Sequence, residues 1–145
     1  MRKAISITLF FAALSGGGAA TASQGSGAIT GTWATGSQGG RVEIYRCGPS
    51  LCGKIVDAAP LRANPDQRDV NNPDRKLRER RLKGLIVLKG FGGGPREWKG
   101  GPVYDPETGD GAAKGYLTLR ADGKLEVKGC KAVLFCRTKV WTHLP

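Results

Sequence analysis

The chain has 145 residues and a formal net charge of +11, from 23 Lys+Arg against 12 Asp+Glu. This length allows one modest hydrophobic core, so we expect a single domain after the N-terminal segment. The only histidine is His143, which argues against a Ser-His-Asp triad and against a zinc site. No apolar run approaches the roughly 18 residues of a membrane-spanning helix.

Residues 1–22 are predicted to be a secretory signal peptide. Arg2 and Lys3 form a positive n-region, Ala4–Leu14 is an apolar stretch, and Ala20-Thr21-Ala22 is an A-x-A cleavage site. Cleavage removes two of the 23 basic residues, leaving 21 against 12 acidic ones, a net charge of +9. We therefore expect an exported protein, periplasmic or secreted; the alternative is a leader retained as an anchor. The charge fits anionic partners outside the cytoplasm, or serves only solubility.

Residues 23–28 are predicted to be disordered, and residues 29–145 to form one β domain. Short apolar or alternating runs recur there, separated by turns rich in Gly, Pro, Asn and Asp. In the alternating runs, Val42 and Ile44 or Leu125 and Val127 share one face, which indicates an antiparallel sandwich or barrel. The predicted strands are Ile29–Ala34, Arg41–Cys47, Cys52–Ala58, Leu85–Phe91, Glu97–Tyr104, Ala112–Leu119, Lys124–Gly129 and Phe135–His143.

The stretch Pro60–Lys83 interrupts the strand pattern. Its first part, Leu61–Asn72, is polar and turn-rich. Asn72 as an N-cap with Pro73 at the first helical position then predicts a short surface helix over Asp74–Leu82. We find no internal repeat and no second domain.

The four cysteines form two close pairs along the chain. Cys47 and Cys52 flank four residues, and Cys130 and Cys136 flank five. In an oxidising compartment an even number of cysteines indicates disulfides, and four cysteines allow three connectivities. We favour Cys47–Cys52 and Cys130–Cys136, because each bridge closes a loop of hairpin size.

Several motifs together support a family resemblance. Gly31-Thr32-Trp33 at the first strand resembles the start of lipocalin-type barrels, whose Trp packs across the closed end. Further motifs are Tyr45-Arg46-Cys47, Leu51–Ile55, Asp69–Asp74, Trp98, Val103–Pro106, Leu125–Cys130 and Trp141. From about Gly31 to Trp141 the chain resembles the bacterial secreted family labelled domain of unknown function twenty-one forty-seven.

This resemblance implies an all-β fold: a small antiparallel lipocalin-like β-barrel of about eight strands with one short helix. It implies export and no established activity. A basic residue, usually Arg, is expected shortly after the last Trp, where it would stack on the barrel-closing Trp33. This chain has His143 there, so we expect a weaker or pH-dependent closing contact.

The leading functional hypothesis is a module that binds a small, largely apolar ligand inside the barrel. Aromatic residues expected near the cavity are Trp98, Tyr104 and Tyr116, and polar residues expected near its mouth are Asp69, Asn71, Asn72 and Arg78. We assign no catalytic residue, cofactor, metal or nucleic acid; the oxygen-rich stretch Asp66–Asp74 lacks EF-hand spacing.

Two hypotheses of other classes stay open. In the second, a basic face around the run 75–83 binds anionic envelope polymers or a partner protein, and the barrel is only a scaffold. In the third, the chain is an enzyme built on carboxylates such as Asp69 and Asp105, which would have to meet in a cleft.

Overall fold

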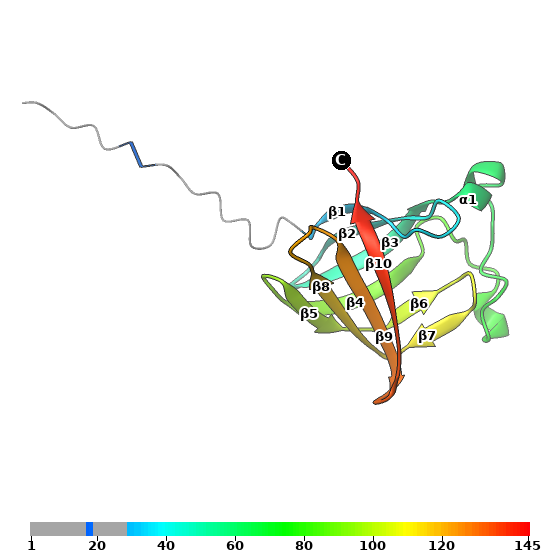
Figure 1. Ribbon diagram of the computed structural model, residues 1–145. Coiled ribbons are helices and arrows are strands. Elements are labelled where there is room, and N and C mark those ends of the chain that lie inside the picture. Colours follow the sequence, from blue (N-terminus) through cyan, green and yellow to red (C-terminus); the bar gives the residue numbers. More distant parts are fainter. Residues whose placement is uncertain (1–16, 19–28) are drawn as a thin grey trace, which may run out of the picture.

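Figure 1 shows the computed structural model of the chain, which describes residues 17–18 and 29–145. The predicted leader, apart from residues 17–18, and the predicted disordered segment 23–28 lie outside the described residues. Within the described part, no helix is both long enough and apolar enough to cross a membrane.

Eight antiparallel strands close into a barrel. Their order is β3-β2-β1-β10-β9-β8-β5-β4, and β4 pairs back with β3. The remaining two strands, β6 and β7, form a hairpin that joins β4 where Leu88 faces Val103 (Figure 1). The bounds are β1 Gly31–Ala34, β2 Arg41–Cys47, β3 Ser50–Asp57, β4 Ile86–Gly93, β5 Glu97–Gly100, β6 Val103–Asp105, β7 Asp110–Ala112, β8 Lys114–Leu119, β9 Leu125–Ala132 and β10 Phe135–His143. The prediction of an all-β barrel of about eight strands with one short helix is confirmed.

Alternation along the strands builds the core as the sequence indicates. Val42 and Ile44 of β2 are buried, and Leu125 and Val127 of β9 are buried between more exposed neighbours. Leu117 of β8 lies directly across from Val127 in the register, so inward side chains of adjacent strands contact each other.

Two predicted strands are each divided in the structure. Glu97–Tyr104 splits into β5 and β6 at Gly101-Pro102, because Pro102 has no N–H to donate and Gly101 has a φ of +146°. Ala112–Leu119 likewise splits between β7 and β8. Because of this division, β5 pairs with β8, whereas β6 pairs with β7 in a separate hairpin.

The predicted helix over Asp74–Leu82 is wrong. Only one 3-10 turn forms there, η1 Arg75–Leu77, capped by Asp74, whose Oδ1 accepts from Lys76 N at 2.9 Å. The chain then pairs back on itself, since Asp69 N donates to Arg80 O at 3.0 Å and Leu82 N donates to Gln67 O at 3.0 Å. That antiparallel pairing takes up the N–H of Leu82, which in the predicted helix would bond to the carbonyl of Arg78.

The α-helix of the described chain lies earlier, at α1 Ala59–Ala63. Pro60 occupies its first turn, where a missing N–H costs nothing, and Leu61 is buried.

Trp33 is part of the buried core and pairs with the C-terminal strand. It is fully buried, its Nε1 donates to Ile29 O at 2.9 Å, and its ring meets that of His143 edge to face at 4.8 Å. A side chain at Gly31 would place its Cβ 2.8 Å from His143 Nε2. The histidine thus occupies the place where an arginine was expected, in direct contact with Trp33.

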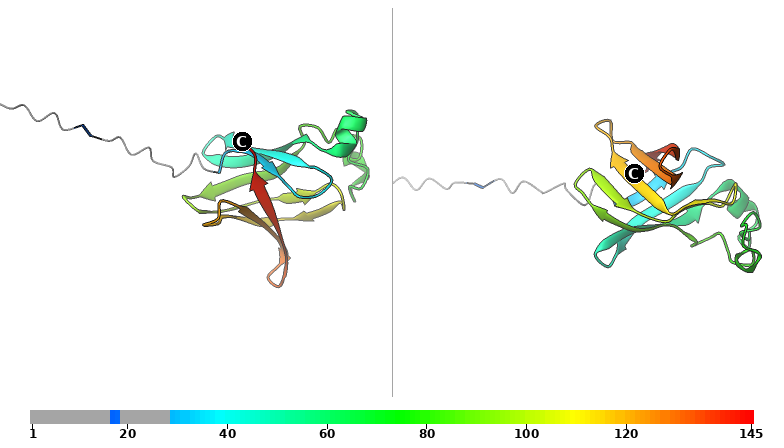
Figure 2. Two further views of the ribbon diagram at one scale, coloured as in Figure 1. Left: turned by 45° about the horizontal axis from the view of Figure 1, so that its top comes forward. Right: turned by 90° about the horizontal axis from the view of Figure 1, so that it is seen from below.

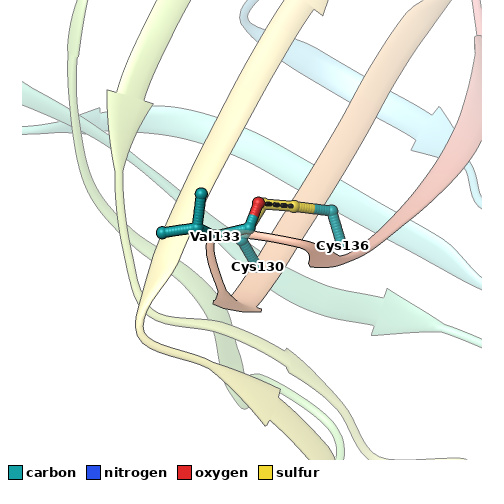
Figure 3. Close-up of a disulfide and its surroundings, with 3 residues drawn as sticks. All are labelled: Cys130, Val133 and Cys136. Carbon is teal, nitrogen blue, oxygen red and sulfur yellow. Dashed lines mark hydrogen bonds between the residues drawn. A yellow bond between two sulfur atoms is a disulfide. The ribbon is translucent and has the colours of Figure 1, made fainter.

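Both favoured disulfides are confirmed. Cys47–Cys52 closes the β2–β3 hairpin with a Cα–Cα distance of 5.8 Å. Cys130 and Cys136 face each other across β9 and β10 with a Cα–Cα distance of 4.1 Å (Figure 3). Each bridge therefore braces one hairpin.

Candidate functional site: a cavity beside a short strand

The barrel encloses a cavity of about 620 Å³ at one end. Its lining comes from several stretches, chiefly residues 35–42, 55–61, 67–71, 103–112 and 134–141. The apolar part of its wall includes Val42, Ile55, Leu61, Leu82, Val87, Val103, Val127 and Trp141. Phe91, Leu88 and Trp98, which are buried, do not line it and fill the other part of the interior.

Because β1 is short, it leaves most of one edge of β10 unpaired beside the cavity. This strand has four residues and pairs with β10 only at Trp33–His143 and Ala34–Thr142. Within the described chain, β10 from Phe135 to Trp141 therefore pairs with β9 alone, and its other edge has no strand beside it.

Trp141 provides a polar group inside the cavity wall. Its side chain is 6% exposed, yet Nε1 is the one buried side-chain nitrogen or oxygen without a hydrogen-bond partner among the described residues. An unmet buried donor of this kind costs roughly 1–3 kcal/mol.

Ion pairs surround the cavity mouth, which we define as the region between the β6–β7 hairpin and β9–β10. Lys139 pairs with Asp105 at 2.7 Å, and Asp110 pairs with Lys131 at 2.7 Å and with Arg137 at 3.1 Å. The hydrogen bond from Lys131, together with its charge, lowers the pKa of Asp110. These pairs join β6–β7 to the two strands opposite.

Behind the mouth, a buried carboxylate holds the segment 67–82 to β6. Asp69 is fully buried; its Oδ1 accepts from Tyr104 Oη at 2.5 Å, and its Oδ2 accepts from Asn72 Nδ2 at 2.9 Å. Arg80 donates to the same Oδ2 from Nε at 2.9 Å, and its Nη2 lies 2.8 Å from that oxygen in an ion pair. Burial, reinforced by the Asp69 hydrogen bond and charge, raises the pKa of Tyr104 to about 12, so its hydroxyl remains a donor at neutral pH.

Comparison with protein-family models gives one match, over residues 31–143, described as "Uncharacterized protein conserved in bacteria (DUF2147)". The chain belongs to this family. Among solved structures it is similar to protein HP1028 from Helicobacter pylori, described as belonging to the lipocalin family. The identity is 22%, the TM-score is 0.67, and the match covers 81% of this chain and 83% of that one, so the likeness shows a lipocalin-like fold. Curated protein sequences give no significant match.

Two of the predicted ligand-binding residues line the cavity, Tyr104 and Asn71. Asn71 also donates from Nδ2 to Pro106 O at 3.1 Å and to Glu107 O at 3.0 Å, which attaches its loop to the β6–β7 turn. Asp69, Asn72 and Arg78 lie behind the wall, where Arg78 Nε donates to Asn72 O at 2.7 Å. These three residues therefore hold the segment behind the cavity wall in place and do not line the cavity.

Trp98 and Tyr116 are not brought to the cavity. Trp98 is buried in the filled part of the core. Tyr116 alternates with the inward Leu117, and its ring lies 5.8 Å from Lys128 Nζ. The alternation of β8 was visible in the sequence, so the outward direction of Tyr116 could have been found there.

The sequence reasoning missed Trp141 as a cavity residue. The residues on the same side of β10 at two-residue spacing are Arg137 and Lys139, which are charged and exposed, so the alternation of this strand does not mark that side as buried. Only the register, in which Trp141 faces the buried Leu125, shows the direction of this side chain.

In the described part of the chain, no group of three or more His, Cys, Asp or Glu residues is placed to hold a metal ion.

Proposed function

We propose that the barrel is a binding module for a small, largely apolar molecule that has a hydrogen-bond acceptor. The observation that supports it best is the cavity of about 620 Å³ with an aliphatic wall and the unmet Nε1 of Trp141. Sites for small molecules typically measure about 300–1,000 Å³ and combine apolar walls with a few polar groups. The ligand's apolar body would contact Val87 and Val127. Its acceptor would bind Trp141 Nε1 after a small rotation of the indole, because that nitrogen is covered in the structure.

We further propose that the chain is not an enzyme. The two carboxylates considered as catalytic groups are each neutralised by a cation: Asp69 by Arg80 at 2.8 Å and Asp105 by Lys139 at 2.7 Å. A glycosidase-type pair needs one protonated and one free carboxylate on either side of a substrate. Export is part of the same proposal, and the two disulfides fit an oxidising compartment.

The first test is native mass spectrometry of the protein purified after export, compared under native and denaturing conditions. We expect a reproducible added mass that leaves on denaturation, and the denatured mass reports whether residues 1–22 are gone. The Trp141→Phe variant should retain its ligand about 2–10-fold less well, since one hydrogen bond contributes about 0.5–1.5 kcal/mol.

A neutral naphthylamine dye, whose emission rises in apolar surroundings, gives a second measurement. Val127→Trp should abolish the enhancement, because it fills the cavity. Val140→Trp is the matched control, since Val140 is 42% exposed and does not line the cavity. A clean apo mass in repeated preparations, with equal dye binding by both variants, would refute the proposal.

A salt series separates this function from the surface alternative. Cavity binding should change little as ionic strength rises, whereas binding of an anionic polysaccharide to the basic surface should fall steeply. Polymer binding that falls with salt, in a protein without cavity binding, would favour the surface-interaction protein.

A further inference from the structure

The tip of the β9–β10 hairpin exposes three consecutive apolar side chains. Val133 is 93% exposed, Leu134 is 90% exposed and Phe135 is 74% exposed, the three highest values among the large apolar residues of the described chain. We call these three residues the hairpin tip. Figure 1 and Figure 2 show the hairpin projecting beyond the rest of the barrel, so the tip is convex and stands away from the core.

The base of this projection is braced. Cys130 and Cys136 join the two strands directly below the tip, and Cys136 Sγ lies 3.9 Å from Val133 O (Figure 3). That approach is a packing contact, because a bridged sulfur has no hydrogen to donate. The disulfide fixes the loop ends, so little conformational entropy remains to be lost there when the tip binds something.

Positive charge predominates on the two strands that carry the tip. The segment 127–143 contains four cations and no carboxylate, namely Lys128, Lys131, Arg137 and Lys139. Three of them pair with Asp105 and Asp110 of the β6–β7 hairpin, while Lys128 lies over the Tyr116 ring at 5.8 Å. Four cations and two carboxylates therefore leave a net charge of +2 on the strands that carry the apolar tip and the hairpin paired with them.

We propose that the hairpin tip docks the protein on an anionic lipid bilayer. Val133, Leu134 and Phe135 insert at the level of the upper acyl chains, and Lys128 and its neighbours meet lipid phosphates. A bilayer accepts a convex apolar wedge without a matching pocket, whereas a protein partner needs a concave site of complementary shape. The positive surroundings select an anionic surface over a neutral one.

Docking would also place the cavity mouth at the lipid surface, because Leu134 and Phe135 border the cavity as well. This consequence rests on the proposed function: an apolar ligand could then pass between bilayer and cavity with little exposure to water. The docking itself does not depend on a ligand, so the two proposals can fail separately.

The test is flotation of the exported protein, with leader removal verified by mass, on vesicles of phosphatidylglycerol and of phosphatidylcholine. We expect binding to the first, weaker binding to the second, and release as salt rises. The variant V133S/L134S/F135S should bind phosphatidylglycerol at least about tenfold less, because it removes the inserted apolar surface.

The matched control is V70S/I86S/V140S, which changes three other exposed apolar residues and should bind as the unaltered protein does. Thermal unfolding of both variants verifies that they fold. The proposal is overturned by equal vesicle binding of the tip variant and the control. It is equally overturned by a protein that binds neither vesicle, or by one whose tip drives self-association in solution while vesicle binding is absent.

Discussion

Replacing Asp69 by alanine should destabilise the protein more than any other single carboxylate removal in the segment 67–82. Asp69 is the one acidic side chain there that is fully buried, and its carboxylate accepts three hydrogen bonds and forms an ion pair with Arg80. These come from Asn72, Arg80 and Tyr104, and they tie the segment to β6.

The magnitude follows from what the substitution leaves unpaired. Removing one partner of a buried ion pair costs about 3–5 kcal/mol when the other charge stays buried. The side chain of Arg80 is 36% exposed and can regain water, which reduces that cost, while the part-buried hydroxyl of Tyr104 loses its acceptor. We therefore expect a loss of about 3 kcal/mol in the free energy of unfolding.

Urea denaturation with both disulfides intact measures this loss. Asp66→Ala is the matched control, because Asp66 pairs with Arg81 at 2.9 Å while both side chains are more than half exposed. Such a pair contributes about 0–1 kcal/mol. Tyr104→Phe added to Asp69→Ala should cost little more, since both act in one network. A loss below about 1 kcal/mol for Asp69→Ala would refute the supporting role of the cluster.

The remaining predictions concern pH and backbone geometry. Since the folded pKa of Tyr104 is raised from 10.0 to about 12, its contribution to stability is complete below pH 10 and lost as the pH rises toward 12; Tyr104→Phe should lose that dependence in alkaline unfolding. Since the folded pKa of Asp110 is lowered from 3.8, its contribution is present above that value and lost in more acid solution, so Asp110→Asn should flatten acid unfolding monitored by circular dichroism. Gly31→Ala should lower the melting temperature more than Gly36→Ala: both have a positive φ, but only at Gly31 does a new Cβ meet His143. Equal melting temperatures would contradict the contact argument.

Local patterns in the sequence were sufficient to predict the strands, disulfides and turns, because each depends on one short stretch of the chain. The two-residue alternation of Val42 and Ile44 established a half-buried strand, and the close spacing of Cys130 and Cys136 indicated a bridge across one hairpin. The turns between strands follow from Gly, Pro, Asn and Asp in the same way.

The same local reasoning failed where distant residues compete for backbone and side-chain groups. The segment over Asp74–Leu82 has helix-start chemistry, yet Arg80 O accepts from Asp69 N, and the Arg80 side chain binds the Asp69 carboxylate. Leaving the buried carboxylate without these donors would cost more free energy than forming a short surface helix would gain.

The sequence by itself thus determined the strands, the disulfides, the barrel-type fold and the basic charge, because each depends on residue type and spacing over a few positions. The tertiary structure alone decided where the barrel is hollow, beside the edge of β10 that β1 leaves unpaired by ending at Ala34. It also decided that Asp69 would meet Tyr104 from 35 positions away, and that Trp141 Nε1 would be buried without a partner. Such features arise from closure of the sheet, which brings distant strands together and which no single stretch of sequence encodes.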